Sequence, residues 1–213
     1  MTASVVTFSI QLGSGGYVVA EAAAQMLGYR YIDRDVLALA ASRAGVTQEL
    51  VASAEQWPRL IERLMNNLAA VSVPEDEDIP APAILLDGMT MRQSSDYRNL
   101  IEQVVHDLSS QGSCAIVGHA AQVILKGQDN VLKVLLVGSP ERRAERIRRD
   151  QGVSSDEARK TVRDSDRERR RFFKNAYGVD WLEPSLYDLV LNTDALDDPT
   201  AAAIVLKAAR DIP

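Results

Sequence analysis

A glycine-rich segment near the start of the chain has the residue types and spacing of a phosphate-binding site. Three glycines and a serine follow the apolar run Val5–Ile10 almost directly: Gly13, Ser14, Gly15 and Gly16. A helical, alanine-rich pattern then runs from Tyr17 to Leu27. Glycines let backbone N–H groups turn towards one point, and a helix N-terminus adds unpaired donors and a partial positive charge. An ordinary strand-to-helix turn, which also uses glycine, is the alternative.

The glycine loop lacks two groups of the standard phosphate-binding motif, Gly-x-x-x-x-Gly-Lys-[Ser/Thr]. If Gly15 is the last glycine of that motif, Ile10 takes the position of the first. Gly16 then stands in the lysine position, and Tyr17 in that of the hydroxyl that binds magnesium. The sequence therefore predicts a backbone cradle without its usual cation and metal ligand.

Arginines gather in one later segment of an otherwise acidic chain. Residues 141–174 hold 13 Lys/Arg and 8 Asp/Glu, a net charge of +5, which leaves 11 basic and 22 acidic residues elsewhere. Helical spacing puts two sets of arginines each on one side of a helix: Arg142, Arg146 and Arg149, then Arg163, Arg167 and Arg170. Each arginine alone could belong to a solvated, ion-paired face, but the cluster favours phosphate binding.

Two further candidate side chains follow apolar runs. Asp33 could help to hold magnesium through water or position an acceptor hydroxyl, or it could cap a helix that begins near Asp35. His119 could bind phosphate when protonated, or it could be a half-buried neutral histidine at a strand end.

Composition limits the class of protein. The chain has 213 residues, 46% of them hydrophobic, which suits one domain with a mobile subdomain. A net charge of −6 argues against non-specific nucleic-acid or membrane partners. Cys114 is the only cysteine and there are two separated histidines, so no disulfide or zinc site is expected. Without a signal pattern or an apolar stretch of membrane-spanning length, we expect a soluble cytoplasmic protein.

Alternating apolar runs and helical patterns predict an α/β fold with a five-stranded parallel sheet and helices on both faces. The runs are Val5–Ile10, Tyr29–Ile32, Cys114–Val117, Val131–Val137 and Tyr187–Leu191. Ligands of such sheets lie beyond the carboxyl ends of the strands. We therefore expect four segments to share one edge: 13–16, 33–35, 118–119 and 192–194.

Two helical regions interrupt this alternation. In the first, helices are expected over 35–44, 47–53, 58–71 and 94–110, with an exposed acidic loop over 74–82. In the second, one helix from Pro140 to about Asp150 is broken by Gly152, and another, capped near Ser154, runs to about Asn175. This charged helix pair is typical of a lid.

The chain resembles the cytidylate-kinase-like proteins, a branch of the nucleoside-monophosphate kinases. The resemblance covers nearly the whole chain and is weakest from Thr47 to Ser94. The matching segments are the glycine loop, 28–37, 112–118, Asp166 with Arg167 and Arg169, 172–174, and the tail residues Tyr177, 180–181 and 187–193. It implies a three-layer P-loop kinase-like fold in a single domain, residues 1–213, with a helical acceptor-side insertion over 35–110 and a lid over 140–175.

Several positions depart from the family pattern. Its loop often reads Ser-Arg-x-x-Gly-Ser-Gly-Gly-Arg, and the two arginine positions are Ile10 and Tyr17 here. Its acceptor strand usually ends in Gly-Arg-x-x-Asp, where this chain has His119 and Gln122 in place of arginine and aspartate. Because phosphoryl transfer depends on positioning and charge stabilisation, these losses should slow it unless other groups compensate.

The resemblance implies transfer of the ATP γ-phosphoryl group, with Mg²⁺, to a nucleoside monophosphate such as CMP or a similar small acceptor. The expected catalytic residues are Arg167, Arg169 and Asp33. The expected phosphate-binding residues are Gly13, Ser14, Gly15, Gly16, Arg142, Arg146 and Arg163. His119 is expected at the acceptor and Asn192 at the base. The alternatives are a pseudokinase that binds nucleotide or phosphate without turnover, and a structural protein. Acceptor, oligomeric state and cellular role stay open.

Overall fold

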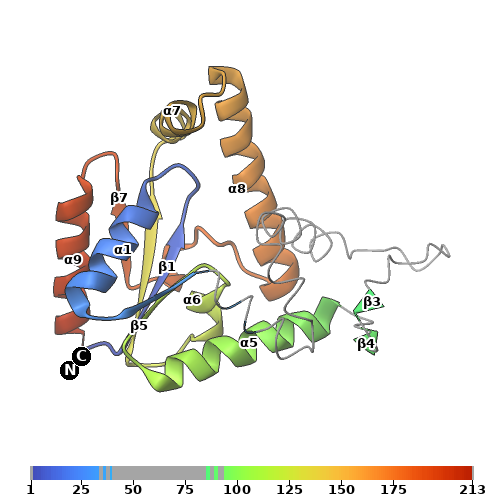
Figure 1. Cartoon of the computed structure of the whole chain (residues 1–213), viewed down its shortest axis with the longest axis vertical. Coiled ribbons are helices and arrows are strands. Elements are labelled where there is room, and N and C mark those ends of the chain that lie inside the picture. The colour runs from blue at the N-terminus through green and yellow to red at the C-terminus, as the bar shows by residue number, and fades with distance from the viewer. Residues whose placement is uncertain are drawn as a thin grey trace.

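Five parallel strands form the sheet that carries the site (Figure 1). In this computed structural model, residues 2–33, 36, 39, 85–86, 89–90 and 94–212 are described. The strand order is β2-β5-β1-β6-β7. The strands are β1 (Val5–Ile10), β2 (Arg30–Ile32), β5 (Cys114–Val117), β6 (Val131–Val137) and β7 (Leu189–Asn192). The five predicted strands are confirmed, with ends that agree to within two residues.

The central strand β1 is buried along its whole length, because helices cover both faces of the sheet. Val5 is in register with Cys114 in β5 and with Val131 in β6. β-Branched residues make up much of β1, β5 and β6, as is typical of a strand that packs on both faces. The near-continuous apolar runs in the sequence thus correspond to buried parallel strands.

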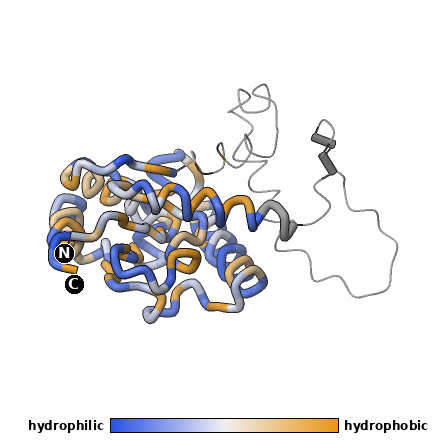
Figure 2. The backbone as a smooth tube through the Cα atoms, turned by 90° about the horizontal axis from the view of Figure 1, so that it is seen from below, coloured by the Kyte–Doolittle hydropathy of each residue, from blue (hydrophilic) through white to orange (hydrophobic). Residues whose placement is uncertain are grey.

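Helices α1 (Gly16–Leu27) and α9 (Asp198–Asp211) cover one face of the sheet (Figure 1). Small residues let these helices pack closely on the strands: Ala20, Ala23 and Ala24 in α1, and Ala201, Ala202 and Ala209 in α9. The described parts nearest the two ends of the chain lie side by side (Figures 1 and 2), where the Ala3 N–H donates to the Ala209 carbonyl at 2.7 Å.

The other face is covered by α5 (Ser94–Gln111), α6 (Ala121–Ile124) and the C-terminal half of α8 (Ser155–Tyr177). Phe173 of α8 stacks on the fully buried Trp181, with ring centroids 6.4 Å apart. Helix α5 matches the predicted helix at 94–110. Three short elements complete the described fold: β3 (Leu85–Leu86) and β4 (Met89–Thr90), an antiparallel pair, and the 3₁₀ helix η1 (Pro184–Leu186).

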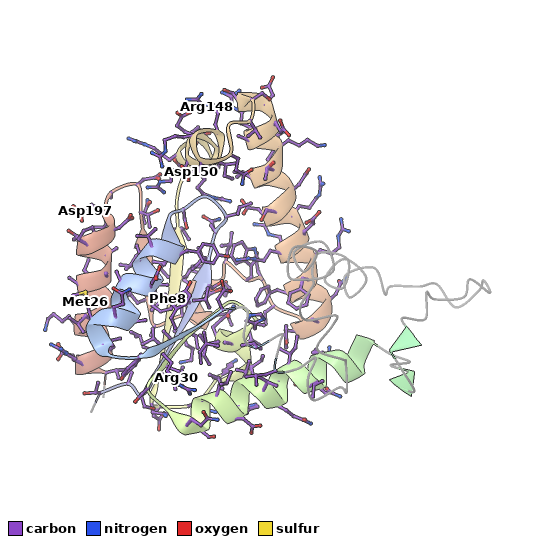
Figure 3. The ribbon with its side chains drawn as sticks, in the orientation of Figure 1. Phe8, Met26, Arg30, Arg148, Asp150 and Asp197 are labelled. Atoms are coloured by element: carbon purple, nitrogen blue, oxygen red, sulfur yellow. The ribbon has the colours of Figure 1, made fainter. Side chains whose placement is uncertain are left out.

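Helix α7 (Pro140–Gln151) and helix α8 form the pair predicted as a lid. Ser139 and Ser154 cap their N-termini, and Gly152 ends α7 with a positive φ of 68°. A small apolar cluster joins the helices: Ala144, Ile147, Ala158 and Val162. Figure 3 places Arg148 and Asp150 on α7, at the opposite end of the molecule from Arg30 at the start of β2.

The expected helices over 35–44, 47–53 and 58–71 and the acidic loop over 74–82 lie outside the described residues, apart from residues 36 and 39. The division of the chain into a helical insertion over 35–110 and a lid over 140–175 therefore remains a prediction. Among the helices that the structure describes, none is both long and apolar enough to cross a bilayer.

Candidate functional site

The carboxyl ends of the strands bring the predicted site segments to one edge of the sheet. Ile10, the last residue of β1, is in register with Leu136 of β6, and Phe8 is in register with Val117, the last residue of β5. β7 runs parallel to β6, and Asp33 directly follows β2. The glycine loop, Asp33, the segment after β5 and the turn after β7 all leave the sheet on this side.

The glycine loop needs its glycines for both conformation and space. Gly13 and Gly15 each have a φ of +79°, in the left-handed region. A Cβ atom on Gly13 would lie 2.6 Å from the backbone oxygen of Arg143, and one on Gly16 would lie 2.7 Å from the Ile10 side chain. The loop thus fits tightly between β1 and α7.

The loop presents unpaired amide donors at the N-terminus of α1. Within the described ranges, the N–H groups of Gly13, Gly15 and Tyr17 have no hydrogen-bond partner. The Gly16 N–H donates to the buried Ser14 hydroxyl at 3.3 Å. Unpaired amides at the start of a helix attract an anion through both their hydrogen atoms and the helix dipole.

Arg146 joins the glycine loop to the turn after β7. Its Nη1 lies 2.5 Å from the Ser14 carbonyl oxygen, 3.4 Å from that of Gly13 and 3.3 Å from the Thr193 hydroxyl. Its Nη2 donates to the Thr193 carbonyl oxygen at 3.1 Å. The guanidinium predicted to bind phosphate therefore lies at the loop, with its donors on protein oxygens.

Arg143 ties α7 and α8 to the glycine loop. Sequence reasoning counted it in the arginine-rich segment but did not single it out as a site residue. It is 1% exposed, its Nε donates to the Leu12 carbonyl oxygen at 2.8 Å, and it binds both carboxylate oxygens of Asp166 at 2.7 and 2.8 Å. Its position beside Ala144 and one turn before Ile147, both of them apolar residues of the helical pattern, was the available signal. A bidentate pair of this kind is strong and directional.

Arg169, predicted as catalytic, reaches from α8 to the end of β1. Its Nη1 donates to the Ile10 carbonyl oxygen, and its guanidinium carbon lies 5.1 Å from the centre of the Trp181 ring. The Ile10 side chain itself is 3% exposed and packs in the core. A guanidinium therefore does lie next to residue 10, but it comes from α8.

The other predicted lid arginines lie on the surface. Arg142 and Arg163 are exposed, and Arg167 pairs with Asp164 at 2.8 Å with 65% of its side chain exposed. Such exposed side chains rearrange readily, because surface ion pairs contribute little. Their predicted phosphate contacts stay predictions.

His119 points to the backbone of Asp33 across the ends of β2 and β5. Its Nε2 lies 2.7 Å from the Asp33 carbonyl oxygen, so this nitrogen carries the hydrogen. Burial lowers the pKa of His119, which outweighs the opposing effect of Asp33. Gly118, His119 and Ala120 all have positive φ values, from 55° to 79°. The geometry thus fits the neutral alternative better than a cationic phosphate ligand.

Gln122, which replaces the family's aspartate, belongs to a buried polar cluster. Its amide donates to the Tyr187 hydroxyl at 3.2 Å, and that hydroxyl donates to the Trp181 carbonyl oxygen at 2.5 Å. Burial raises the pKa of Tyr187, although hydrogen bonds with Ser9 and Gln122 oppose the rise. The side chain that would be an acidic group in the family supports packing beneath the site here.

The turn after β7 is ordered by its own side chains. The Asn192 side-chain oxygen accepts from the Asp194 N–H at 2.9 Å, and Asp194 accepts from the Ser139 N–H at 2.8 Å. Burial raises the pKa of Asp194, but the hydrogen bonds from Ser139 and the charges of Arg142 and Arg146 together have the larger effect. The pKa of Asp194 is therefore below its usual value. Asn192 is exposed at this turn, and its predicted contact with a base stays a prediction.

Metal ligands are sparse in this part of the molecule. No group of three or more His, Cys, Asp or Glu side chains that could hold a metal occurs among the residues described. Mg²⁺ is commonly held by one or two carboxylates together with phosphate oxygens, so a magnesium site does not require such a group. Asp33 is the described carboxylate at the end of β2 that could reach such an ion through water.

Solved structures share the fold at low sequence identity. A crystal structure of an uncharacterized protein from Eubacterium ventriosum matches with a TM-score of 0.68 and 17% identity, over 96% of this chain and 97% of that one. Shikimate kinase from Bacteroides thetaiotaomicron matches with a TM-score of 0.50 and 14% identity, over 95% and 94% of the two chains. The fold is thus the P-loop kinase fold.

Curated relatives are named cytidylate kinase. The protein of Methanothrix thermoacetophila is 27% identical over 208 residues, 97% of this chain and 98% of its own. That of Pyrococcus horikoshii is 28% identical over 131 residues, 58% of this chain and 67% of its own. The sequence profile of the cytidylate kinase-like family matches residues 5–195. This chain therefore belongs to the cytidylate kinase-like family.

Proposed function

We propose that this protein binds ATP at the glycine loop and transfers its γ-phosphoryl group to a nucleoside monophosphate or a similar small acceptor. Family membership supports a nucleotide kinase-like function. The observation that carries the proposal is the set of unpaired amides at Gly13, Gly15 and Tyr17, aligned with the N-terminus of α1. These donors provide the backbone part of a phosphate site, and the soluble α/β fold suits a cytoplasmic enzyme.

The side chains around the loop have distinct roles in this proposal. ATP supplies the phosphoryl group and its bound Mg²⁺ offsets the phosphate charge. Arg169 places a cation at the end of β1, and Arg167, Arg142 and Arg163 can swing from the surface to phosphate oxygens. Asp33 lies after β2, where it can orient an acceptor hydroxyl, and Asn192 lies where a base could rest.

A second candidate is a protein that binds nucleotide or phosphate without turnover. Ile10 and Tyr17 leave the two arginine positions of the family loop without a charge, and the Ile10 side chain is buried in the core. His119 donates to the Asp33 backbone. These are the cationic positions on which phosphoryl transfer depends in the family pattern, and transfer without them should be slow.

Calorimetry and a transfer assay separate the two candidates. Titration with ATP, ADP and CMP, each with and without magnesium, tests binding at the loop. A coupled assay that follows ADP release with CMP and other monophosphates then tests transfer. Binding with acceptor-dependent ADP release supports the enzyme, and binding alone supports the second candidate. No binding of any nucleotide refutes the enzyme and the nucleotide-binding form of the second candidate.

A further inference from the structure

We propose that Arg146 is a positioning residue that fixes the direction of the loop's peptide groups, and that it is not itself a phosphate ligand. This inference rests on the proposed function, since it concerns how the glycine loop is kept ready for phosphate. Its basis is the set of contacts from the Arg146 guanidinium to the Gly13, Ser14 and Thr193 oxygens.

Peptide geometry converts these contacts into a direction for the donors. A trans peptide group is planar, with its C=O and N–H pointing to opposite sides. The Ser14 carbonyl points at Arg146 at 2.5 Å, so the N–H of the same peptide group, that of Gly15, points away from α7. The Gly15 amide is one of the unpaired donors of the loop. The contact of Arg146 with the Ser14 carbonyl oxygen therefore keeps the Gly15 N–H directed away from α7, where it is available to bind phosphate.

Glycine makes such a restraint necessary. Gly13 and Gly15 adopt left-handed conformations, and glycine visits other regions of φ/ψ space at little cost. If the peptide group between Ser14 and Gly15 turned over, a carbonyl oxygen would face the phosphate position in place of the N–H. That oxygen would repel an anion. A guanidinium bound to the carbonyl opposes this rotation.

The same side chain couples two segments that both border the site. Arg146 binds the hydroxyl and the carbonyl oxygen of Thr193, in the turn after β7. The Thr193 hydroxyl also donates to the Val137 carbonyl oxygen at 3.0 Å, which fixes it to the end of β6. The planar fork of arginine can serve both segments at once, whereas a lysine ammonium on the same helix offers a single point of charge.

Three variants test the proposal: Arg146→Met, Arg146→Lys and Arg148→Met as the matched control. Arg148 lies on the same helix, is exposed and pairs only with Glu145 in the described part of the chain. The first readout is amide hydrogen exchange of Ser14 without nucleotide, because its N–H donates to the Gln11 carbonyl oxygen at 3.0 Å inside the loop. Circular dichroism checks that each variant folds.

We expect both Arg146 variants to speed Ser14 exchange about tenfold, the effect of losing roughly one hydrogen bond of stabilisation. The control should match the wild type. The second readout is the ADP dissociation constant by calorimetry. It should rise about tenfold or more in both Arg146 variants, because the lysine keeps the charge and loses the fork.

Two results would overturn the inference. Unchanged Ser14 exchange in both Arg146 variants would show that the contacts do not restrain the loop. An Arg146→Lys variant with near wild-type ADP affinity would show that charge at this position matters and the fork does not, as for a direct phosphate ligand. If the wild type binds no ADP, the proposed function fails, while the exchange measurement still reports on the restraint.

Discussion

One methyl group added at Gly13 should destabilise the protein much more than the same group added at Gly152. Both glycines are left-handed, with φ values of +79° and +68°. Each alanine variant therefore carries about 1–2 kcal/mol of backbone strain. Nothing lies within 4 Å of a Cβ atom at Gly152, so strain is the whole effect there.

At Gly13 a steric cost adds to the strain. The new Cβ atom would lie 2.6 Å from the Arg143 oxygen and must move to the 3.4 Å of an ordinary contact, a shift of about 0.8 Å. Helix α7 cannot yield easily, because the Arg143 side chain is fixed to Leu12 and Asp166. Overpacking of this kind costs about 1–3 kcal/mol. Gly13→Ala should therefore lower the free energy of unfolding by about 2–5 kcal/mol, against about 1–2 kcal/mol for Gly152→Ala.

Urea denaturation followed by circular dichroism measures both values, with the wild type as reference. Equal losses in the two variants would refute the reasoning, since they would show that α7 does not press on the glycine loop. A slope against urea that differs between the variants would signal a change in the unfolded or native ensemble, so the slopes are compared first.

Three other outcomes follow from single contacts. Arg143→Met should lower the free energy of unfolding, measured by urea denaturation, by about 2–4 kcal/mol, because it leaves the partly exposed Asp166 carboxylate and the Leu12 carbonyl without their partner. The control Arg148→Met should leave urea denaturation unchanged. The pKa of His119 is lowered in the folded protein, so the folded protein binds a proton at this histidine less readily than the unfolded chain does. Stability should therefore fall as pH drops below 6.5. In thermal denaturation, His119→Gln should remove the part of this pH dependence that comes from His119. Ser113 is exposed with a φ of 48°, so Ser113→Gly should raise stability by about 0.5–1 kcal/mol in the urea assay, and a loss there would contradict the assigned backbone conformation.

The sheet and its helices were predictable because their signals are local. Buried parallel strands such as β1 and β6 appear in the sequence as short apolar runs, and helix ends appear as Pro140, Gly152 and Ser154. The start of β7 was placed two residues early, at Tyr187. This residue is hydrophobic and buried, as strand residues are, but it lies before the first residue that pairs in the sheet.

Contacts of the site were harder to predict, because they join residues far apart in the sequence. Helical spacing placed Arg142, Arg146 and Arg149 on one side of α7, yet only Arg146 reaches the glycine loop. The resemblance to the family marked Ile10 as a lost cation, and only the fold shows Arg169 beside its carbonyl oxygen. The direction of His119 depends on three successive left-handed residues, for which the sequence Gly-His-Ala carries no signal beyond its glycine.

The order of strands in the sheet also has a consequence for biosynthesis. β1 is made first, yet its partners at Cys114 and Val131 follow Val5 by 109 and 126 residues. At translation speeds of about 5–20 residues per second, the strand waits on the order of 5–25 s for them. During that time the six uncharged residues of β1, all of them buried in the folded protein, have no neighbouring strand to pair with. The nascent chain should therefore depend on early shielding by chaperones, and its folding should be slow, as for other sheets built from distant segments.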